Sequence, residues 1–118
     1  MKEPTNYSKF VNELLKPGTD IIMSLDSAKG NLIHLAMGVA GEAGELLDTI
    51  KKHTIYNKEL DYDNLIEELG DIEFFLQGIR NHFAISREDI LMANIVKLGV
   101  RYHEGKYSDK QAQERADK

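Results

Sequence analysis

The chain of 118 residues contains no cysteine, no tryptophan and only two prolines. The lack of cysteine excludes a disulfide-stapled scaffold, a thiolate zinc site and a cysteine nucleophile. The scarcity of proline leaves little that would interrupt a helix. The length is that of one domain, and a composition of 42% hydrophobic and 30% charged residues is typical of a folded globular protein.

An excess of basic residues and a long apolar run are also missing. The formal net charge is −5, from 20 acidic and 15 basic residues, whereas a nucleic-acid-binding protein usually has the opposite balance. The most apolar stretch, residues 32–50, includes Glu42, Glu45 and Asp48, which excludes a membrane span. Because the first residues show no apolar signal segment, we expect a cytoplasmic protein without nucleic-acid or membrane partners.

Apolar residues recur at helical spacing along most of the chain. The pattern predicts a short amphipathic helix over residues 5–15 and longer helices over 31–53, 63–82 and 86–102. No segment alternates with a period of two. We therefore predict an all-α protein, an antiparallel helical bundle that forms a single domain over residues 1–118.

The ends of these segments carry their own signals. The residues around Pro17 and Gly18 should stop the first helix, while residues 21–29 are compatible with either loop or helix. Asp61 or Asp63 can cap the helix over 63–82, and Ser86 can cap the next. We expect the bundle core to span residues 31–102 and the tail over 106–118 to be polar and loosely helical at most.

Acidic residues occupy matched positions on two of the predicted helices. With 100° per residue, Glu42 and Glu45 lie on one flank of the apolar stripe of the helix over 31–53. Glu68 and Asp71 lie on the same relative flank of the helix over 63–82. If the two helices pack antiparallel, the four carboxylates converge, and such a cluster needs a cation or bound protons. Oxygen-only ligands favour Mg²⁺, with Mn²⁺ as a substitute, although the acids could instead be solvated helix surface.

The helix over 86–102 carries polar residues that would complement the acids. Asn94, Lys97 and Arg101 share a face, where the two cations could reach phosphate oxygens or could be ordinary surface charges. Lys51 and Lys52 end an earlier helix, where cations favour the helix dipole but could also contact phosphate. The chain has no His-Glu-x-x-His, Glu-x-x-His or Walker motif, which argues against zinc, ferritin-like and P-loop sites.

Three motifs together carry a resemblance to a known family: Gly41-Glu42-Ala43-Gly44-Glu45-Leu46, Glu67-Glu68-Leu69-Gly70-Asp71 and Asn94-x-x-Lys97-x-x-x-Arg101-Tyr102. They resemble the MazG-like all-α nucleoside triphosphate pyrophosphohydrolases, whose hallmark is Glu-x-x-Glu followed by Glu-x-x-Asp, and small phage-encoded members in particular. Many members have Glu-Glu-x-x-Glu, whereas Gly41 occupies the leading position here.

The resemblance implies a Mg²⁺-dependent enzyme that cleaves a ribo- or deoxyribonucleoside triphosphate into the monophosphate and pyrophosphate. It implies homodimers, or homotetramers built from two dimers. It also implies two sets of site residues. The metal ligands would be Glu42, Glu45, Glu68 and Asp71, and the substrate-side residues would be Asn94, Lys97, Arg101 and Tyr102.

On this reading a carboxylate that is not fully engaged as a ligand, such as Glu45, would take the proton from the attacking water. Lys97 and Arg101 would offset charge on the leaving pyrophosphate, with Lys51 and Lys52 as further phosphate contacts. Two alternatives stay open: a phosphoribosyl-ATP pyrophosphohydrolase on the same bundle, and a non-catalytic helical interaction module. We also expect subunit contacts, because the apolar stripes of three long helices exceed what one subunit can cover. Bulky apolar residues gather near the end of the helix over 63–82 and in the turn after it: Phe74, Phe75, Ile79 and Phe83.

Overall fold

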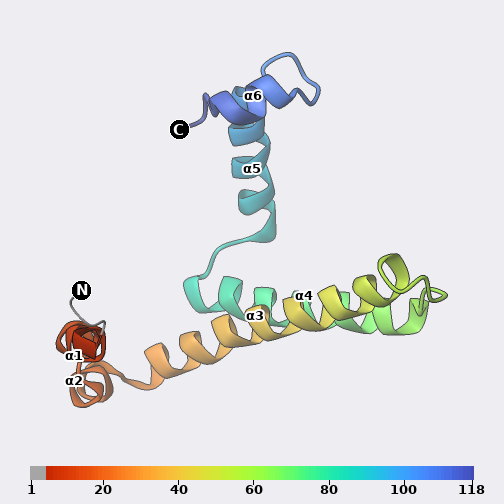
Figure 1. Cartoon of the computed structure of the whole chain (residues 1–118). Coiled ribbons are helices and arrows are strands. Elements are labelled where there is room, and N and C mark those ends of the chain that lie inside the picture. The colour runs from red at the N-terminus through yellow and green to blue at the C-terminus, as the bar shows by residue number, and fades with distance from the viewer. Residues whose placement is uncertain (1–4) are drawn as a thin grey trace. The chain divides into compact units, whose positions relative to one another are not determined.

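A computed structural model describes residues 5–118, and all regular structure in that range is helical (Figure 1). The helices are α1 (Thr5–Leu14), α2 (Gly18–Ser24), α3 (Ser27–Thr54), α4 (Tyr62–Phe83), α5 (Arg87–Arg101) and α6 (Asp109–Glu114). The prediction of an all-α protein is confirmed. The chain forms two compact units, Met1–His34 and Leu35–Lys118, and the boundary between them falls inside α3.

The first unit contains α1, α2 and the first two turns of α3. The break expected around Pro17 and Gly18 is short, because α2 begins directly after Pro17. Pro17 has a φ of −59° and lacks a backbone N–H, and neither property hinders a helix that starts at the next residue. The segment 21–29, which the sequence left open, is divided between α2 and the start of α3. Asp26 caps that start by accepting a hydrogen bond of 2.8 Å from the backbone N–H of Lys29.

The second unit begins with a helical hairpin made of α3 and α4. The Asp61 carboxylate accepts a hydrogen bond of 3.1 Å from the Asn64 backbone N–H, so the predicted cap of α4 is present. The helix ends at Phe83, and the next residue, Ala84, has a left-handed φ of 53° that turns the chain out of the helical path. Both ends of α4 lie within one residue of the predicted range, whereas α3 begins four residues earlier than expected.

Glycines allow α3 and α4 to approach closely. The Phe75 ring lies against Gly38 so tightly that a Cβ at that position would overlap three ring atoms, and the Leu35 side chain covers Gly78 in the same way. Further along the hairpin, the Thr49 hydroxyl accepts a hydrogen bond of 2.5 Å from the Asn64 amide. The contacts that cross the hairpin pair Leu35 with Gly78, Gly38 with Phe75, and Thr49 with Asn64. Each step forward along α3 is matched by an equal step back along α4, which defines an antiparallel register.

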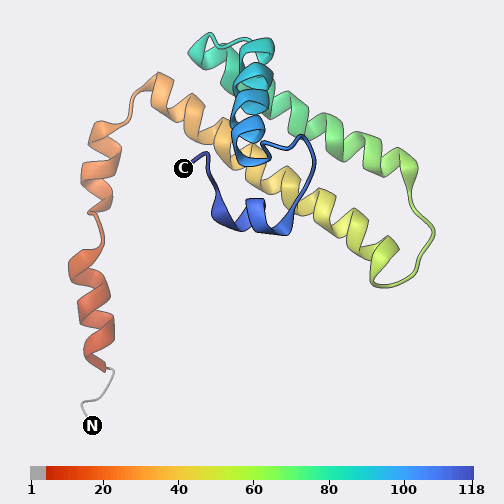
Figure 2. The same cartoon turned by 90° about the horizontal axis from the view of Figure 1, so that it is seen from above.

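The helices α5 and α6 pack against each other at the end of the chain. The Ser86 hydroxyl accepts a hydrogen bond of 3.1 Å from the Asp89 backbone N–H and caps α5 as predicted. Figure 1 shows α5 rising away from the hairpin, and Figures 1 and 2 both place α6 beside its C-terminal end. Gly105, with a φ of 80°, lies in the turn between these two helices.

The single chain has almost no buried core. Among residues 6–118 no hydrophobic residue is buried, and the only buried residues are the polar Thr49 and Gln111. Phe74 on α4 is 69% exposed, and Ile95 and Val96 on α5 are 65% and 64% exposed. No helix in the described range is both long and apolar enough to cross a membrane.

Candidate metal centre

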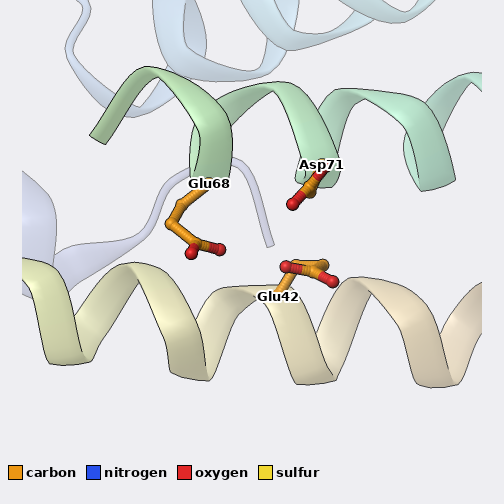
Figure 3. Close-up of side chains that lie close together, drawn as sticks. All are labelled: Glu42, Glu68 and Asp71. Atoms are coloured by element: carbon orange, nitrogen blue, oxygen red, sulfur yellow. The ribbon is translucent and has the colours of Figure 1, made fainter. Parts of the chain in front are cut away.

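Three carboxylates meet between α3 and α4 (Figure 3). Glu42 projects from α3, and Glu68 and Asp71 project from α4 one turn apart. Each side chain offers one oxygen, and these three oxygens all lie within 4.8 Å of one another. Glu42 and Glu68 are half-buried, while Asp71 is exposed. The acidic cluster of Glu42, Glu68 and Asp71 therefore has one side accessible to a ligand.

The register of the hairpin explains why these acids meet. The cluster lies between the Gly38–Phe75 contact and the Thr49–Asn64 hydrogen bond. Counting equal steps from either contact places Glu42 opposite Asp71. The flank predicted from helical periodicity is therefore the flank at which α3 and α4 face each other.

The electrostatics of the cluster centre on Glu68. Burial raises the pKa of the Glu68 carboxyl, and hydrogen bonding to Glu42 together with the charges of Glu42, Glu45 and Asp71 raises it further. One oxygen of this side chain, Oε2, is buried and has no hydrogen-bond partner. A buried acceptor without a donor is costly, and a proton or a cation among these neighbouring carboxylates would relieve the cost.

The donor set fits a divalent metal ion. All three side chains supply oxygen, which hard cations such as Mg²⁺ and Mn²⁺ prefer, and the described residues contribute neither histidine nor sulfur to the cluster. The unpartnered Glu68 oxygen is the observation that favours a cation over a merely solvated group of acids. Glu42, Glu68 and Asp71 are the residues that would hold it.

Glu45, the fourth predicted ligand, lies beside the cluster and outside it. The register places Glu45 opposite Glu68, and its charge contributes to the raised Glu68 pKa. Its side chain is exposed and supplies no oxygen to the group of three. Its backbone carbonyl accepts a hydrogen bond of 3.2 Å from the Thr49 hydroxyl. The assignment of Glu45 as metal ligand or base stays a prediction.

The predicted substrate-side residues on α5 are not gathered at the carboxylates in the single chain. Asn94 and Lys97 are exposed on a helix that rises away from the hairpin (Figure 1). Arg101 donates two hydrogen bonds to Asp117 in the C-terminal tail. Tyr102 is half-buried, and its ring centroid lies 5.7 Å from that of Tyr107.

The two lysines at the end of α3 have local partners. The Lys52 ammonium lies 3.0 Å from the Asp48 carboxylate one turn earlier, and this contact raises the Lys52 pKa. The Lys51 ammonium lies over the Tyr56 ring, 5.5 Å from its centroid. Both arrangements suit a helix C-terminus, and a phosphate contact by either lysine stays a prediction.

Sequence reasoning missed two interactions that shape this unit. The first is the Thr49–Asn64 hydrogen bond. The sequence could have indicated it, because the two polar residues lie opposite each other when the two predicted helices are paired antiparallel. The ion pair of Arg101 with Asp117 was not anticipated either, because a polar tail carries no periodic pattern that would place it.

Comparison with known proteins addresses the same region of the chain. Residues 31–104 match the MazG nucleotide pyrophosphohydrolase domain. The chain belongs to this family. It is also 31% identical over 85 residues to the Gene 37 protein of Mycobacterium phage L5, covering 68% of this chain and 73% of that protein. No solved structure shows significant similarity.

The family assignment confirms the resemblance read from the motifs, and the phage relative is consistent with a small phage-type member. The acidic cluster and the polar face of α5 lie inside the matched range, whereas α6 and Asp117 lie beyond it. The tail is therefore a feature of this chain that the family match does not describe.

Proposed function

We propose that this MazG-family protein hydrolyses a ribo- or deoxyribonucleoside triphosphate to the monophosphate and pyrophosphate in a Mg²⁺-dependent reaction. The observation that carries the proposal is the acidic cluster with its unpartnered Glu68 oxygen, in a chain whose family is that of nucleotide pyrophosphohydrolases. A divalent cation supplies neutralisation of phosphate oxygens and activation of water, chemistry that this cluster is suited to place at a phosphate chain.

The other roles in the reaction are assigned to side chains of this protein. Glu42, Glu68 and Asp71 would hold the cation, which would neutralise charge on the phosphates. Glu45 lies level with Glu68 and outside the cluster, which leaves its carboxylate able to accept the proton of the attacking water. Lys97 and Arg101 are the cations assigned to charge that develops on the leaving pyrophosphate.

The test is an incubation with each ribo- and deoxyribonucleoside triphosphate and with phosphoribosyl-ATP in the presence of Mg²⁺, with the products resolved as mono- or diphosphates. We expect monophosphate and pyrophosphate from one or more nucleoside triphosphates. Turnover of phosphoribosyl-ATP alone would assign the related activity instead. No turnover of any substrate would favour a non-catalytic helical module.

A matched pair of variants ties the activity to the site. Glu68→Gln removes a cluster carboxylate, while Glu67→Gln removes the neighbouring exposed carboxylate of the same helix. We expect Glu68→Gln to abolish both turnover and the rise in melting temperature on addition of Mg²⁺, and Glu67→Gln to keep both. Full activity in Glu68→Gln would refute the site.

We further propose that the protein is a homo-oligomer, a dimer or a pair of dimers. A chain that buries no hydrophobic side chain in its described part lacks the main term that offsets the conformational entropy lost on folding. The exposed apolar residues of α4 and α5 supply surface for a second copy. Light scattering at micromolar concentration should give a multiple of the 13.4 kDa chain mass, and a stable monomer would contradict the proposal.

A further inference from the structure

The tightest ion pair in the second unit joins α5 to the end of the chain. Arg101 Nε donates to Asp117 Oδ1 at 2.8 Å, and Arg101 Nη2 donates to Asp117 Oδ2 at 3.1 Å. The side chains of Arg101 and Asp117 are only 16% and 3% exposed. The pair uses the two-pronged geometry with which a guanidinium binds either a carboxylate or a phosphate.

The fold of the C-terminal tail places the Asp117 carboxylate beside Arg101. The Ser108 hydroxyl accepts a hydrogen bond of 3.2 Å from the Gln111 backbone N–H and caps α6. Arg115 then takes a left-handed φ of 53°, and the Lys118 N–H bonds back to its carbonyl at 2.9 Å. This turn brings Asp117 back to Arg101, sixteen residues earlier in the chain.

Cations outnumber the carboxylate at this corner. Arg115 Nη2 lies 3.9 Å from Asp117 Oδ2, in addition to the two bonds from Arg101. Lys97 and Asp117 line the same groove of about 500 Å³ on the surface of α5 and the tail. Two guanidinium groups lie against this one carboxylate and the Lys97 side chain lines the groove beside it, which leaves positive charge unbalanced, and a phosphate group, with more negative charge, would balance it better.

We propose that the Asp117 carboxylate occupies a phosphate-binding site formed by Arg101, Lys97 and Arg115, and that residues 108–118 form a strap that a di- or triphosphate displaces. The proposal deepens the proposed function and rests on it, because it takes the incoming anion to be the phosphate chain of the substrate or the released pyrophosphate. Opening the strap disrupts a helix of only six residues, a scale of local unfolding that folded proteins undergo readily.

The test measures binding of inorganic pyrophosphate to the full chain by calorimetry, without metal, so that the acidic cluster does not contribute. Asp117→Asn removes the competing charge. Glu114→Gln removes a charge from the same tail, where Glu114 faces Lys110 at 3.8 Å and not Arg101. We expect Asp117→Asn to bind about tenfold more tightly than the wild type, as for a strap open in about a tenth of the molecules, and Glu114→Gln to bind like the wild type. Unchanged or weaker binding by a folded Asp117→Asn would overturn the proposal.

A second measurement uses the unmodified chain, in case Asp117→Asn does not fold. Pyrophosphate should speed amide hydrogen exchange in residues 109–117 while leaving α3 and α4 unchanged. Exchange that stays the same or slows in the tail at saturating pyrophosphate would overturn the strap. The two proposals fail separately, because Glu68→Gln should lose nucleotide hydrolysis and keep metal-free pyrophosphate binding.

Discussion

Replacing Gly38 with alanine tests whether the close approach of α3 and α4 holds the metal centre in place. The new methyl group would overlap three atoms of the Phe75 ring, so the ring must move or the helices must separate. Forcing an extra methyl into a packed contact costs about 1–3 kcal/mol. The substitution also improves helix propensity by about 1 kcal/mol, which partly masks that cost.

Gly44→Ala is the matched control, because Gly44 lies in the same helix and a Cβ there meets nothing within 4 Å. The propensity gain is common to both variants, so the difference between their unfolding free energies isolates the overlap with Phe75. Urea denaturation should place Gly38→Ala about 1–3 kcal/mol below Gly44→Ala. Hydrolysis should fall in Gly38→Ala as well, because Glu42 is one turn away. Equal stabilities would refute the close packing described for this hairpin.

Three further predictions concern single interactions. Thr49→Val leaves the Asn64 amide without its acceptor and should lower the free energy of unfolding, measured with urea, by about 1–2 kcal/mol. Thr54→Val is the control, because both threonines also donate to the carbonyl four residues earlier and Thr54→Val loses only that bond, so it should lower the free energy of unfolding by less. Equal losses in the two variants would contradict this prediction. Lys97→Ala should keep its melting temperature and lose about 2–4 kcal/mol of transition-state stabilisation in kcat/KM, and wild-type kinetics would leave α5 as scaffold. Arg101 lowers the pKa of Asp117 from 3.8 to about 2, so the ion pair stabilises the tail above pH 3.8 and is lost as the pH falls toward 2. Protection of the tail amides from hydrogen exchange should follow the same pH dependence. Protection that survives below pH 2 would refute the role of the Asp117 charge.

The long helices were predictable because each carries several turns of one apolar stripe. α4 also carries end signals that act locally, and Asp61 and Ser86 cap α4 and α5 as expected. α2 was not predictable, since seven residues contain too few turns to distinguish a helix from a loop. Asp117 joins the segment after α6 to Arg101, and no local pattern indicates a partner sixteen residues away.

The candidate site was predictable to the level of helix faces. Periodicity alone placed Glu42, Glu68 and Asp71 on flanks that the hairpin register brings together. It could not say which side chains turn into the gap, and Glu45, although level with Glu68, supplies no oxygen to the cluster. Periodicity also placed Arg101 at an edge of α5. It did not indicate that the Arg101 guanidinium would bind a carboxylate of the same chain.

The acidic cluster reduces stability for the same reason that it suits a metal ion. A carboxyl whose pKa is raised on folding holds its proton more tightly in the folded chain, so the free energy of unfolding falls as the pH rises from the ordinary Glu68 value of 4.5 through the higher folded value. Ionising Glu68 beside Glu42 and Asp71 in the folded chain therefore carries a free-energy penalty. A cation that binds only the folded arrangement removes this penalty and adds its own binding free energy. The hairpin therefore maintains, through the Gly38–Phe75 contact and the Thr49–Asn64 hydrogen bond, an arrangement of charges that becomes favourable when a divalent ion is bound.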